Sequence, residues 1–238
     1  MCKVMGIVNV TPDSFSDGGQ FFKPEEAIRR AKNLIEDGAD IIDLGGESTR
    51  PGATPIGWEE EWGRIEPVLE GLKASIRSVG SISVDTYHPE TAEKAIKAGA
   101  NIINCVYADP IPEVLKLLEG NDVELVLPVK ACSLFPLPCS LFPRLYLDPM
   151  IGFNTTREED VELLRSIPEL AKKGRVLVGA SRKRIVKKLV GEKSAVGKNI
   201  GGNVAIAVWA AMQGASIVRV HDVKETVQAL RVIESLGV

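Results

Sequence analysis

The chain has 238 residues, 45% of them hydrophobic and 26% charged, a composition typical of a globular protein. Its formal net charge of −3 provides no basic footprint for nucleic acid, and no apolar run approaches the roughly 20 residues that a membrane helix requires. We therefore expect a cytoplasmic protein without nucleic-acid or membrane partners. The cysteines lack the close spacing of a metal site and are expected to be reduced thiols: Cys2, Cys105, Cys132 and Cys139.

Short apolar runs alternate with amphipathic stretches along the chain. Eight runs are mostly apolar throughout, as is typical of strands buried on both faces: Val4–Val8, Ile41–Leu44, Ile82–Val84, Ile102–Asn104, Val123–Leu127, Leu145–Leu147, Val176–Val178 and Ile217–Val220. The amphipathic stretches have apolar residues at i, i+3, i+4 and i+7, which predicts helices: Pro24–Glu36, Trp58–Ile76, Pro89–Lys97, Ile111–Leu118, Arg157–Ala171 and Val223–Leu236.

Eight strands that alternate with helices predict an α/β protein, and specifically a (β/α)8 TIM barrel that forms a single domain over residues 1–238. A doubly wound open sheet is the structural alternative. Such a sheet often carries a glycine-rich phosphate turn after its first strand. The sequence has no GxGxxG or GxxxxGK(S/T) pattern, so the barrel is favoured.

The crossover between the fifth and sixth predicted strands differs from the others. It contains four prolines and repeats the word CSLFP, at Cys132–Pro136 and at Cys139–Pro143. Because proline lacks an amide donor and interrupts helices, we expect an extended or irregular, helix-poor crossover with no α-helix of three turns over Cys132–Pro143. Its leucines and phenylalanines are expected to cover the barrel in place of a helix, with a partner surface as the alternative.

Polar residues gather where the predicted strands end. In a TIM barrel the chemistry lies at the carboxyl ends of the strands, which share one mouth. Only the fifth strand, ending in Leu127–Pro128, offers no polar group there. The loop after the first strand, TPDSFSDGG, is also longer than the usual connection of about two to six residues, which indicates a site.

The polar residues divide into two chemical groups. One group suits the amino-pyrimidinone edge of a flat heterocycle: Asp85, Asn104, Asp148 and Lys183. The other suits an anion, since arginine presents a planar fork to phosphate or carboxylate: Asn9, Thr49, Arg50, Arg219 and His221. Taken alone, Asp85 is as consistent with a helix cap, and His221 with a structural role. The convergence of the whole set on one barrel face favours a binding site.

The motifs at these positions resemble those of one enzyme family, the dihydropteroate synthases, which are pterin-binding enzymes of folate synthesis. The sequence contains, in the family's order, the words GIVNVTPDSFSDGG, DIIDLGGESTRPGA, SVDT, IIN, DPMIGF, SRKR and RVHDV. The resemblance extends over nearly the whole chain. It implies a transferase that condenses 6-hydroxymethyl-7,8-dihydropterin diphosphate with para-aminobenzoate and releases diphosphate, with Mg²⁺ assisting.

Carried over position by position, the resemblance implies a set of substrate contacts. The pterin would be held or lined by Asp85, Asn104, Asp148, Phe153 and Lys183. The aminobenzoate would face Ser181 and Lys183. No cysteine is required as a nucleophile, since catalysis would come from stabilising charge as the carbon–oxygen bond breaks.

The resemblance also implies a diphosphate site and two closing loops. Asn9 would ligate magnesium and, with Arg219 and His221, bind the diphosphate. The loops would contribute Ser14 and Phe15 from the first and Thr49, Arg50 and Pro51 from the second. The implied catalytic residues are Asp85, Lys183, Arg219 and His221. A homodimer through the late helices is expected as well, with Trp209 and Met212 as candidate contacts; packing on the barrel is the alternative for both.

The chain departs from the family pattern on strands four to six. Cys105 stands where the family usually has aspartate, and Leu127–Pro128 where it commonly has Met-His. Met150 and Thr155 replace the first glycine and the lysine of DPGxGFGK. These departures keep three alternatives open: an enzyme using another arylamine, a pterin-binding paralogue without synthase activity, and a pterin-dependent methyltransferase. The SRKR and TPDSFSDGG motifs argue against the methyltransferase.

Overall fold

Eight parallel strands of the computed structural model close into a barrel in chain order, with β8 pairing with β1. The structure describes residues 2–11, 23–48, 53–105, 107, 111–134, 143–191 and 199–237, with the backbone alone described over 74–79 and 132–134. The strands are β1 (Lys3–Asn9), β2 (Ile41–Gly45), β3 (Ser81–Asp85), β4 (Ile102–Asn104), β5 (Glu124–Pro128), β6 (Leu145–Asp148), β7 (Arg175–Val178) and β8 (Ile217–Val220). The predicted TIM barrel is thereby confirmed.

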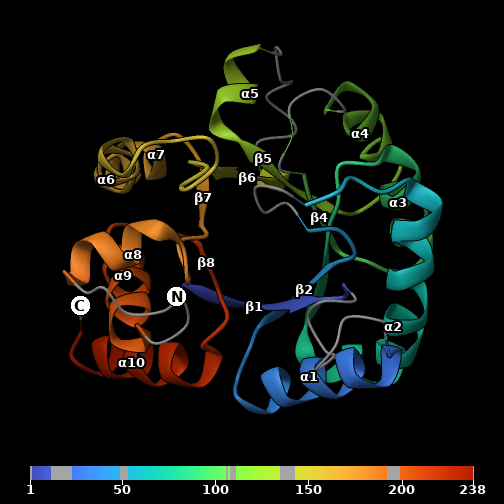
Figure 1. Ribbon diagram of the computed structural model, residues 1–238, viewed down its shortest axis with the longest axis horizontal. Helices are drawn as coiled ribbons and strands as arrows, with labels where there is room; N and C mark the ends of the chain where they lie inside the picture. Colours follow the sequence, from blue (N-terminus) through green and yellow to red (C-terminus); the bar gives the residue numbers. More distant parts are fainter. Residues whose placement is uncertain are drawn as a thin grey trace.

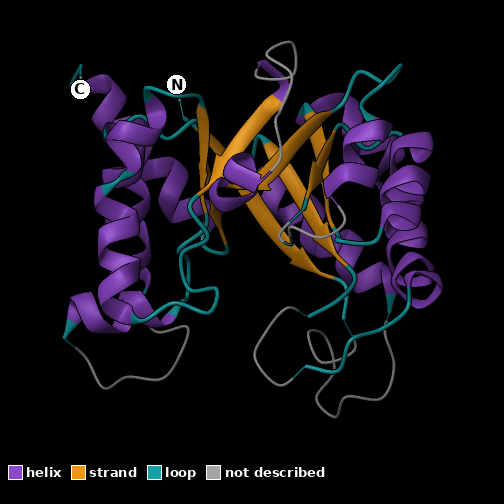
Figure 2. Ribbon diagram, turned by 90° about the horizontal axis from the view of Figure 1, so that it is seen from above, coloured by secondary structure: helices purple, strands orange, loops and turns teal. Residues whose placement is uncertain are grey.

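Helices surround the barrel (Figure 1, Figure 2). They are α1 (Pro24–Glu36), α2 (Trp58–Val79), α3 (Pro89–Ala98), α4 (Ile111–Leu117), α5 (Val129–Leu134), α6 (Arg157–Arg165), α7 (Ile167–Ala171), α8 (Arg184–Val190), α9 (Ile200–Met212) and α10 (Val223–Ser235). In Figure 1, α8, α9 and α10 lie together on one side of the barrel, with α1, α2 and α3 on the other. Within the described ranges, no helix has the length and apolarity needed to cross a bilayer.

The helix predicted over Arg157–Ala171 is divided at Ser166. Pro168 lies in the first turn of α7, and its ring would collide with the carbonyl four residues earlier in a continuous helix. The start of α6 is fixed by a capping box between Thr156 and Glu159. The sequence pattern therefore predicted the amphipathic face correctly but not the break in the helix axis.

The crossover after β5 begins with a helix that the proline count did not predict. The expectation of an extended or irregular chain is wrong over Val129–Leu134, where α5 forms. Pro128 ends β5 and precedes the helix, and residues 129–134 contain no proline, so nothing in that stretch interrupts helical hydrogen bonds. The helix has six residues, so the described part of Cys132–Pro143 contains no α-helix of three turns. Residues 135–142, which include most of the CSLFP repeat, lie outside the described residues.

Two apolar layers hold the barrel together, because successive strand residues face opposite sides. The layer inside the barrel consists of Met5, Ile41, Ile102, Val126, Tyr146, Leu177 and Ile217. Their sequence neighbours, such as Val4 and Ile42, belong to a larger cluster between strands and helices. The same alternation decides which residues reach the mouth of the barrel.

Gly46 follows β2 directly and lies against α2. A Cβ at this position would be 2.9 Å from Cγ of Glu61, 3.0 Å from the Glu61 carbonyl oxygen and 3.0 Å from Cγ1 of Ile65. The carbonyl of Gly46 accepts a hydrogen bond from Nη1 of Arg64 at 2.8 Å. Since a backbone oxygen cannot swing aside as a side chain can, this close approach requires glycine and fixes where the chain leaves β2.

We expect Gly46→Ala to lower the free energy of unfolding by about 1–3 kcal/mol, because the added carbon overpacks Glu61 and Ile65. Gly63→Ala is the control, since a Cβ at Gly63 in α2 meets no described atom within 4 Å. The control should gain up to about 1 kcal/mol from helix propensity. Urea denaturation measures the free energy of unfolding of both variants. If that free energy changed in the same direction in the two variants, the packing described for Gly46 would be wrong.

Candidate active site

Strand pairing brings polar residues to one mouth of the barrel. Asn9 of β1 pairs with Gly45 of β2, Gly45 pairs with Asp85 of β3, and Asp85 pairs with Asn104 of β4. Paired residues on adjacent strands share a face of the sheet. Asn104 lies two residues after Ile102 of the interior layer, so this whole row faces into the barrel.

The same alternation adds three charged residues to the inward row. Asp43, Asp148 and Arg219 each follow an interior residue by two positions, after Ile41, Tyr146 and Ile217. All three lie at or near the carboxyl ends of their strands. The barrel fold therefore brings residues that are more than one hundred positions apart in the chain to the same mouth.

Two strands leave the mouth bare. Pro128 of β5 pairs with Asp148 of β6 and offers no side-chain donor or acceptor. Beyond β7 the inward position is Gly179, where a Cβ would lie 3.9 Å from Cβ of Arg219 and 4.0 Å from Nζ of Lys183. The polar groups thus form a continuous arc over β8, β1, β2, β3 and β4, with Asp148 of β6 alone between two bare strands.

Arg219 links the carboxylates of two neighbouring strands. Its Nε donates to Oδ2 of Asp43 at 2.6 Å, and its Nη2 donates to Oδ2 of Asp85 at 2.6 Å. Asn104 donates from Nδ2 to Oδ2 of Asp43 at 3.4 Å. Oδ1 of Asp43 and Oδ1 of Asn104 are buried and accept no hydrogen bond from any described atom. The mouth therefore holds two acceptors that a ligand donor would satisfy.

The electrostatics of the mouth follow from burial and from the number of carboxylates. Burial raises the pKa of Asp85 to about 7; Arg219 opposes the rise, and Asp43 and Asp148 add to it. Burial also raises the pKa of Asp148, against the opposing charge of Lys183. Burial disfavours the charge of Arg219, but the carboxylates outweigh this cost and raise its pKa. Such shifted groups in one concave place are typical of a functional site.

Lys183 lies on the β6–β7 side of the mouth, at the N-cap of α8. Its Nζ donates to the carbonyl of Ile151 at 2.6 Å and lies 4.3 Å from the ring centre of Phe153. Burial lowers the pKa of Lys183 to about 8, and Asp148 partly counteracts this. Asp148 in turn accepts from the amide of Met150 at 2.7 Å. The three residues expected on the pterin side, Asp148, Phe153 and Lys183, thus lie around one turn.

Ser181 and His221 meet where β7 and β8 end. The amide of His221 donates to Oγ of Ser181 at 3.2 Å, and Nδ1 of the ring lies 3.1 Å from the same oxygen. Asn9 is half-buried at the end of β1. Its Oδ1 and Oδ2 of Asp85 both lie 4.0 Å from the place where Gly45 lacks a Cβ. The remaining predicted contacts lie outside the described residues: Ser14, Phe15, Thr49, Arg50 and Pro51.

Asp43 is the residue of this site that sequence reasoning missed. It lies inside the apolar run IIDL, and the sequence analysis looked for polar residues only after the strands. The signal was a single carboxylate in a strand that should be apolar on both faces. The alternative role of Asp85 as a helix cap is not what forms, because the N-cap of α3 is His88 and Asp85 binds Arg219.

Cys105 stands where the family usually has aspartate and forms part of the packed core. Its thiol is 1% exposed and donates to the carbonyl of Tyr107 at 3.4 Å. Burial raises the pKa of Cys105 to about 12. A thiol that stays protonated is a poor nucleophile, so the site offers no thiolate for covalent catalysis at this position.

The turn after β6 holds two non-glycine residues in left-handed backbone conformation. Met150 has φ 63° and Asn154 has φ 51°, on either side of Gly152 at 78°. Met150 and Asn154 occupy the first and last glycines of the DPGxGFGK pattern. The substitutions kept the backbone shape that the glycines make easy, at a cost of about 1–2 kcal/mol for a residue with a Cβ.

Known proteins are similar to this chain over nearly its full length. The family model of the pterin binding enzymes matches residues 5–132 and 142–221. The dihydropteroate synthase of Staphylococcus haemolyticus is 38% identical over 255 residues, covering 98% of this chain and 94% of the relative. Two solved structures of the Xanthomonas albilineans synthase are also similar. The one with 4-aminobenzoic acid has TM-score 0.87 and 39% identity, covering 99% of this chain and 93% of that one. The one with 7,8-dihydropteroate has TM-score 0.85 and 36% identity, covering 99% and 94%.

A closed parallel barrel with its ionisable groups at the carboxyl ends of the strands is the architecture of a TIM-barrel enzyme. The family model and the relatives show which family of TIM-barrel enzymes this is. This chain belongs to the pterin-binding enzyme family and, within it, to the dihydropteroate synthases, which are transferases. The relatives support synthase function over a pterin-binding paralogue without activity and over a methyltransferase.

We expect Met150→Gly to be more stable than Met150→Ala by about 1 kcal/mol, because only glycine adopts φ near 63° without strain. Both variants remove the same side chain beyond Cβ, so their difference isolates the backbone. Chemical denaturation at one pH measures it. If Met150→Ala were more stable than Met150→Gly, as alanine is relative to glycine inside a helix, the turn would carry no such strain.

Proposed function

We propose that this chain condenses 6-hydroxymethyl-7,8-dihydropterin diphosphate with para-aminobenzoate through the mouth residues described above. The observation that carries the assignment of roles is the buried set of carboxylates and amide around Arg219, with two acceptors free of described donors. A pterin presents an amino group and a ring N–H side by side along one edge. Acceptors such as Asp43 and Asn104 match those donors, and replacing water there costs little once both are paired.

The second half of the pterin site would be formed from the β6–β7 side. Asp148 is an acceptor, and Lys183 is a donor whose pKa of about 8 keeps it mostly charged at neutral pH. Phe153 lies against Lys183 and offers an apolar surface to the ring system. We place the arylamine beside Ser181 and Lys183, at the outer edge of the same turn. Para-aminobenzoate is the amine that an enzyme of this family uses, as the Xanthomonas structure with 4-aminobenzoic acid illustrates for a relative.

The diphosphate would lie over the ends of β1 and β8. Arg219 uses Nε and one Nη nitrogen for Asp43 and Asp85, which leaves its other Nη nitrogen as a donor toward phosphate oxygens. His221 adds a ring nitrogen from the residue after β8. Both groups stabilise charge that grows on the leaving oxygen as the carbon–oxygen bond breaks.

Magnesium fits this end of the mouth as an ion shared with the substrate. Among the described residues, no group of three His, Cys, Asp or Glu side chains could hold a metal alone. Asn9 would supply its Oδ1, which lies beside Gly45 at the end of β1 on the inward row. Magnesium usually binds one or two protein oxygens and completes its shell with phosphate and water. Bound there, it would neutralise charge on the departing diphosphate.

The reaction then needs no covalent enzyme intermediate. The carbon–oxygen bond of the pterin methylene breaks, and the electron pair leaves with the diphosphate. The carboxylate of Asp85, near the centre of the mouth, stabilises the positive charge left on the methylene and pterin ring. The arylamine nitrogen, held by Ser181 and Lys183, attacks that carbon and afterwards loses a proton. The residues act by position and charge, which agrees with the inert thiol of Cys105.

Diphosphate release with purified protein tests these roles. Asp85→Ala should lower turnover by about 10²-fold or more, because the developing cation loses its carboxylate. Lys183→Ala should cause a severe loss, since both the pterin and the arylamine lose a cation. Circular dichroism checks that each variant is folded, because Asp85→Ala leaves Arg219 paired with Asp43 alone. Lys172→Ala, at an exposed lysine after α7, is the matched control. Release by Asp85→Ala at the wild-type rate would exclude a chemical role for this carboxylate.

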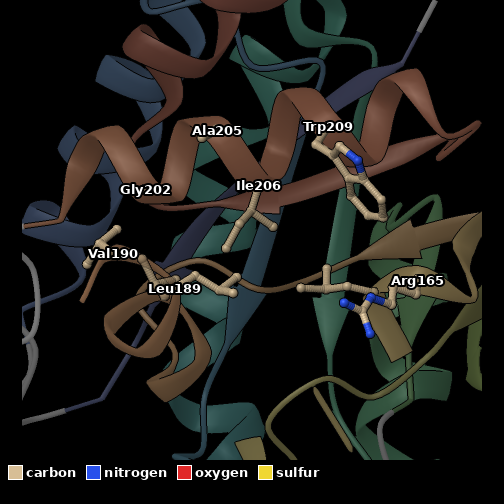
Figure 3. A pocket seen from close by; sticks show the side chains of 9 residues that line it. Arg165, Leu189, Val190, Gly202, Ala205, Ile206 and Trp209 are labelled. Carbon is tan, nitrogen blue, oxygen red and sulfur yellow. The ribbon is translucent and has the colours of Figure 1, made fainter. Parts of the chain in front are cut away.

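We propose further that residues 1–238 act as one domain, in the cytoplasm, and as a homodimer through the late helices. The support for the compartment is that Cys2 and Cys105 are free thiols. The support for the dimer is an apolar groove of about 440 Å³ between α6, α8 and α9. In Figure 3, Ile206 and Trp209 project from α9 and Leu189 from α8 along this groove. Met212, one turn beyond Trp209, is 50% exposed.

We expect Trp209→Glu to raise the dimer dissociation constant by about 30-fold or more, because a charge would be buried at an aromatic contact. Lys97→Glu is the control, since Lys97 is exposed on α3, on the other side of the barrel (Figure 1). Sedimentation velocity over a concentration series measures both. A wild type that is monomeric at high concentration, or a Trp209→Glu variant that dimerises like wild type, would contradict this interface.

A further inference from the structure

The loop after β7 is held in an unfavourable backbone conformation between two residues of the proposed site. Arg182 has φ 59°, a left-handed value that is costly for a residue with a Cβ. It stands between Ser181, which binds His221, and Lys183, which reaches Ile151 and Phe153. Because a change of φ at Arg182 would swing its neighbours, both side chains depend on this conformation being maintained.

Two buried residues outside the loop maintain it. The amide of Arg182 donates to Oδ1 of Asn203 at 2.9 Å, and Nη2 of Arg182 donates to Oδ1 of Asp222 at 2.5 Å. Asn203 closes the ring by donating from Nδ2 to Oδ2 of Asp222 at 2.8 Å. Asn203 is 4% exposed and Asp222 is 7% exposed. Each of these three bonds joins a donor to an acceptor, and Asn203 uses both ends of its amide.

Asp222 does not cap α10 with its side chain, although its position predicts that role. It is the N-cap of α10, where an aspartate normally accepts from the first helical amides, yet its side chain makes no cap bond. Both carboxylate oxygens serve Arg182 and Asn203 instead. The adjacent pairs Ser181–His221 and Arg182–Asp222 therefore join the loop after β7 to the loop after β8 at two consecutive positions.

We propose that Asn203 and Asp222 are positioning residues for the synthase reaction: they clamp Arg182 in its left-handed conformation and so set where Ser181 and Lys183 stand. This inference rests on the proposed function, since Ser181 and Lys183 are assigned there to the arylamine and the pterin. Neither Asn203 nor Asp222 needs to touch a substrate. Their effect passes through the backbone of Arg182.

A reciprocal exchange of the two side chains tests the clamp. Asn203→Asp sets two carboxylates against each other. Asp222→Asn replaces one of two acceptors by a donor, which then faces either the amide of Asn203 or, when the new amide is flipped, the guanidinium of Arg182. Flipping the amide of Asn203 does not relieve the second conflict, because it turns a donor toward the amide of Arg182. The double variant Asn203→Asp with Asp222→Asn restores a donor and an acceptor at each contact. It also keeps one carboxylate near Arg182.

We expect each single variant to lose about tenfold or more in kcat/KM for the arylamine and to bind 6-hydroxymethylpterin more weakly, while the double variant returns to within about threefold of wild type. Val227→Ala, a core truncation elsewhere on α10, serves as a control of matched destabilisation. It should lower the melting temperature and leave kcat, KM and pterin affinity unchanged. Hydrogen exchange at the Arg182 amide should be fast in Asp222→Asn and slow again in the double variant.

Single variants with wild-type kinetics and affinity would overturn the clamp. So would losses that the double variant does not recover, or losses that Val227→Ala reproduces at equal melting temperature. A wild type that binds the pterin but releases no diphosphate would instead overturn the proposed function. In that case the pterin dissociation constants of the variants and the Arg182 exchange rates still decide whether the clamp exists.

Discussion

The ion pairs of Arg219 with Asp43 and Asp85 are the interaction on which the mouth depends. Like charges on neighbouring strands would repel within a few ångströms in a poorly hydrated place, and a single guanidinium from the opposite end of the chain pairs with both of them. One positive charge offsets only one of the two carboxylates, so the trio carries a net negative charge when both are ionised. Burial, the main cause of the raised pKa of Asp85, works against that charge. A catalytic centre that stabilises a cation benefits from such residual negative charge, because it exists before substrate arrives and costs no rearrangement during the reaction.

Local patterns predicted every strand of the scaffold and most of its helices, but α8 and α9 were not among them. Apolar runs marked every strand, since strands of a closed barrel are buried on both faces, and amphipathic spacing marked α1, α2, α3 and α10 to within a few residues. The failures have local causes as well. Prolines on either side of Val129–Leu134 concealed a short helix that contains none, and the apolar face of Arg157–Ala171 continued across a change of axis at Ser166.

The site was only partly open to prediction, because its key contacts are distant in the chain. Arg219 is 176 positions from Asp43 and 134 from Asp85, and no local pattern relates them. Strand ends identified Asp85, Asn104 and Asp148, whereas Asp43 needed the barrel register to show that it faces the same way. Strand ends also identified Lys183, and the resemblance gave Ser181 its expected role. The supports of Arg182 were not predicted: Asn203 lies in α9 outside the quoted motifs, and Asp222 lies inside RVHDV but was given no role.

Polar side chains are distributed unevenly around the barrel mouth, because β5 and β7 contribute none at their inward ends. Polar groups run without interruption from β8 to β4, whereas β5 and β7 present Pro128 and Gly179 and leave Asp148 isolated between them. A flat ring with hydrogen-bonding groups along one edge can match the long arc only when that edge faces it. Turned over, the same ring would set its donors against Pro128 and the Lys183 ammonium, with the carboxylate of Asp148 as the acceptor on that side, so fewer of them would regain the hydrogen bonds that they lose with water. The barrel thus selects which face of a planar molecule points toward the second reactant, and it does so through what two strands lack.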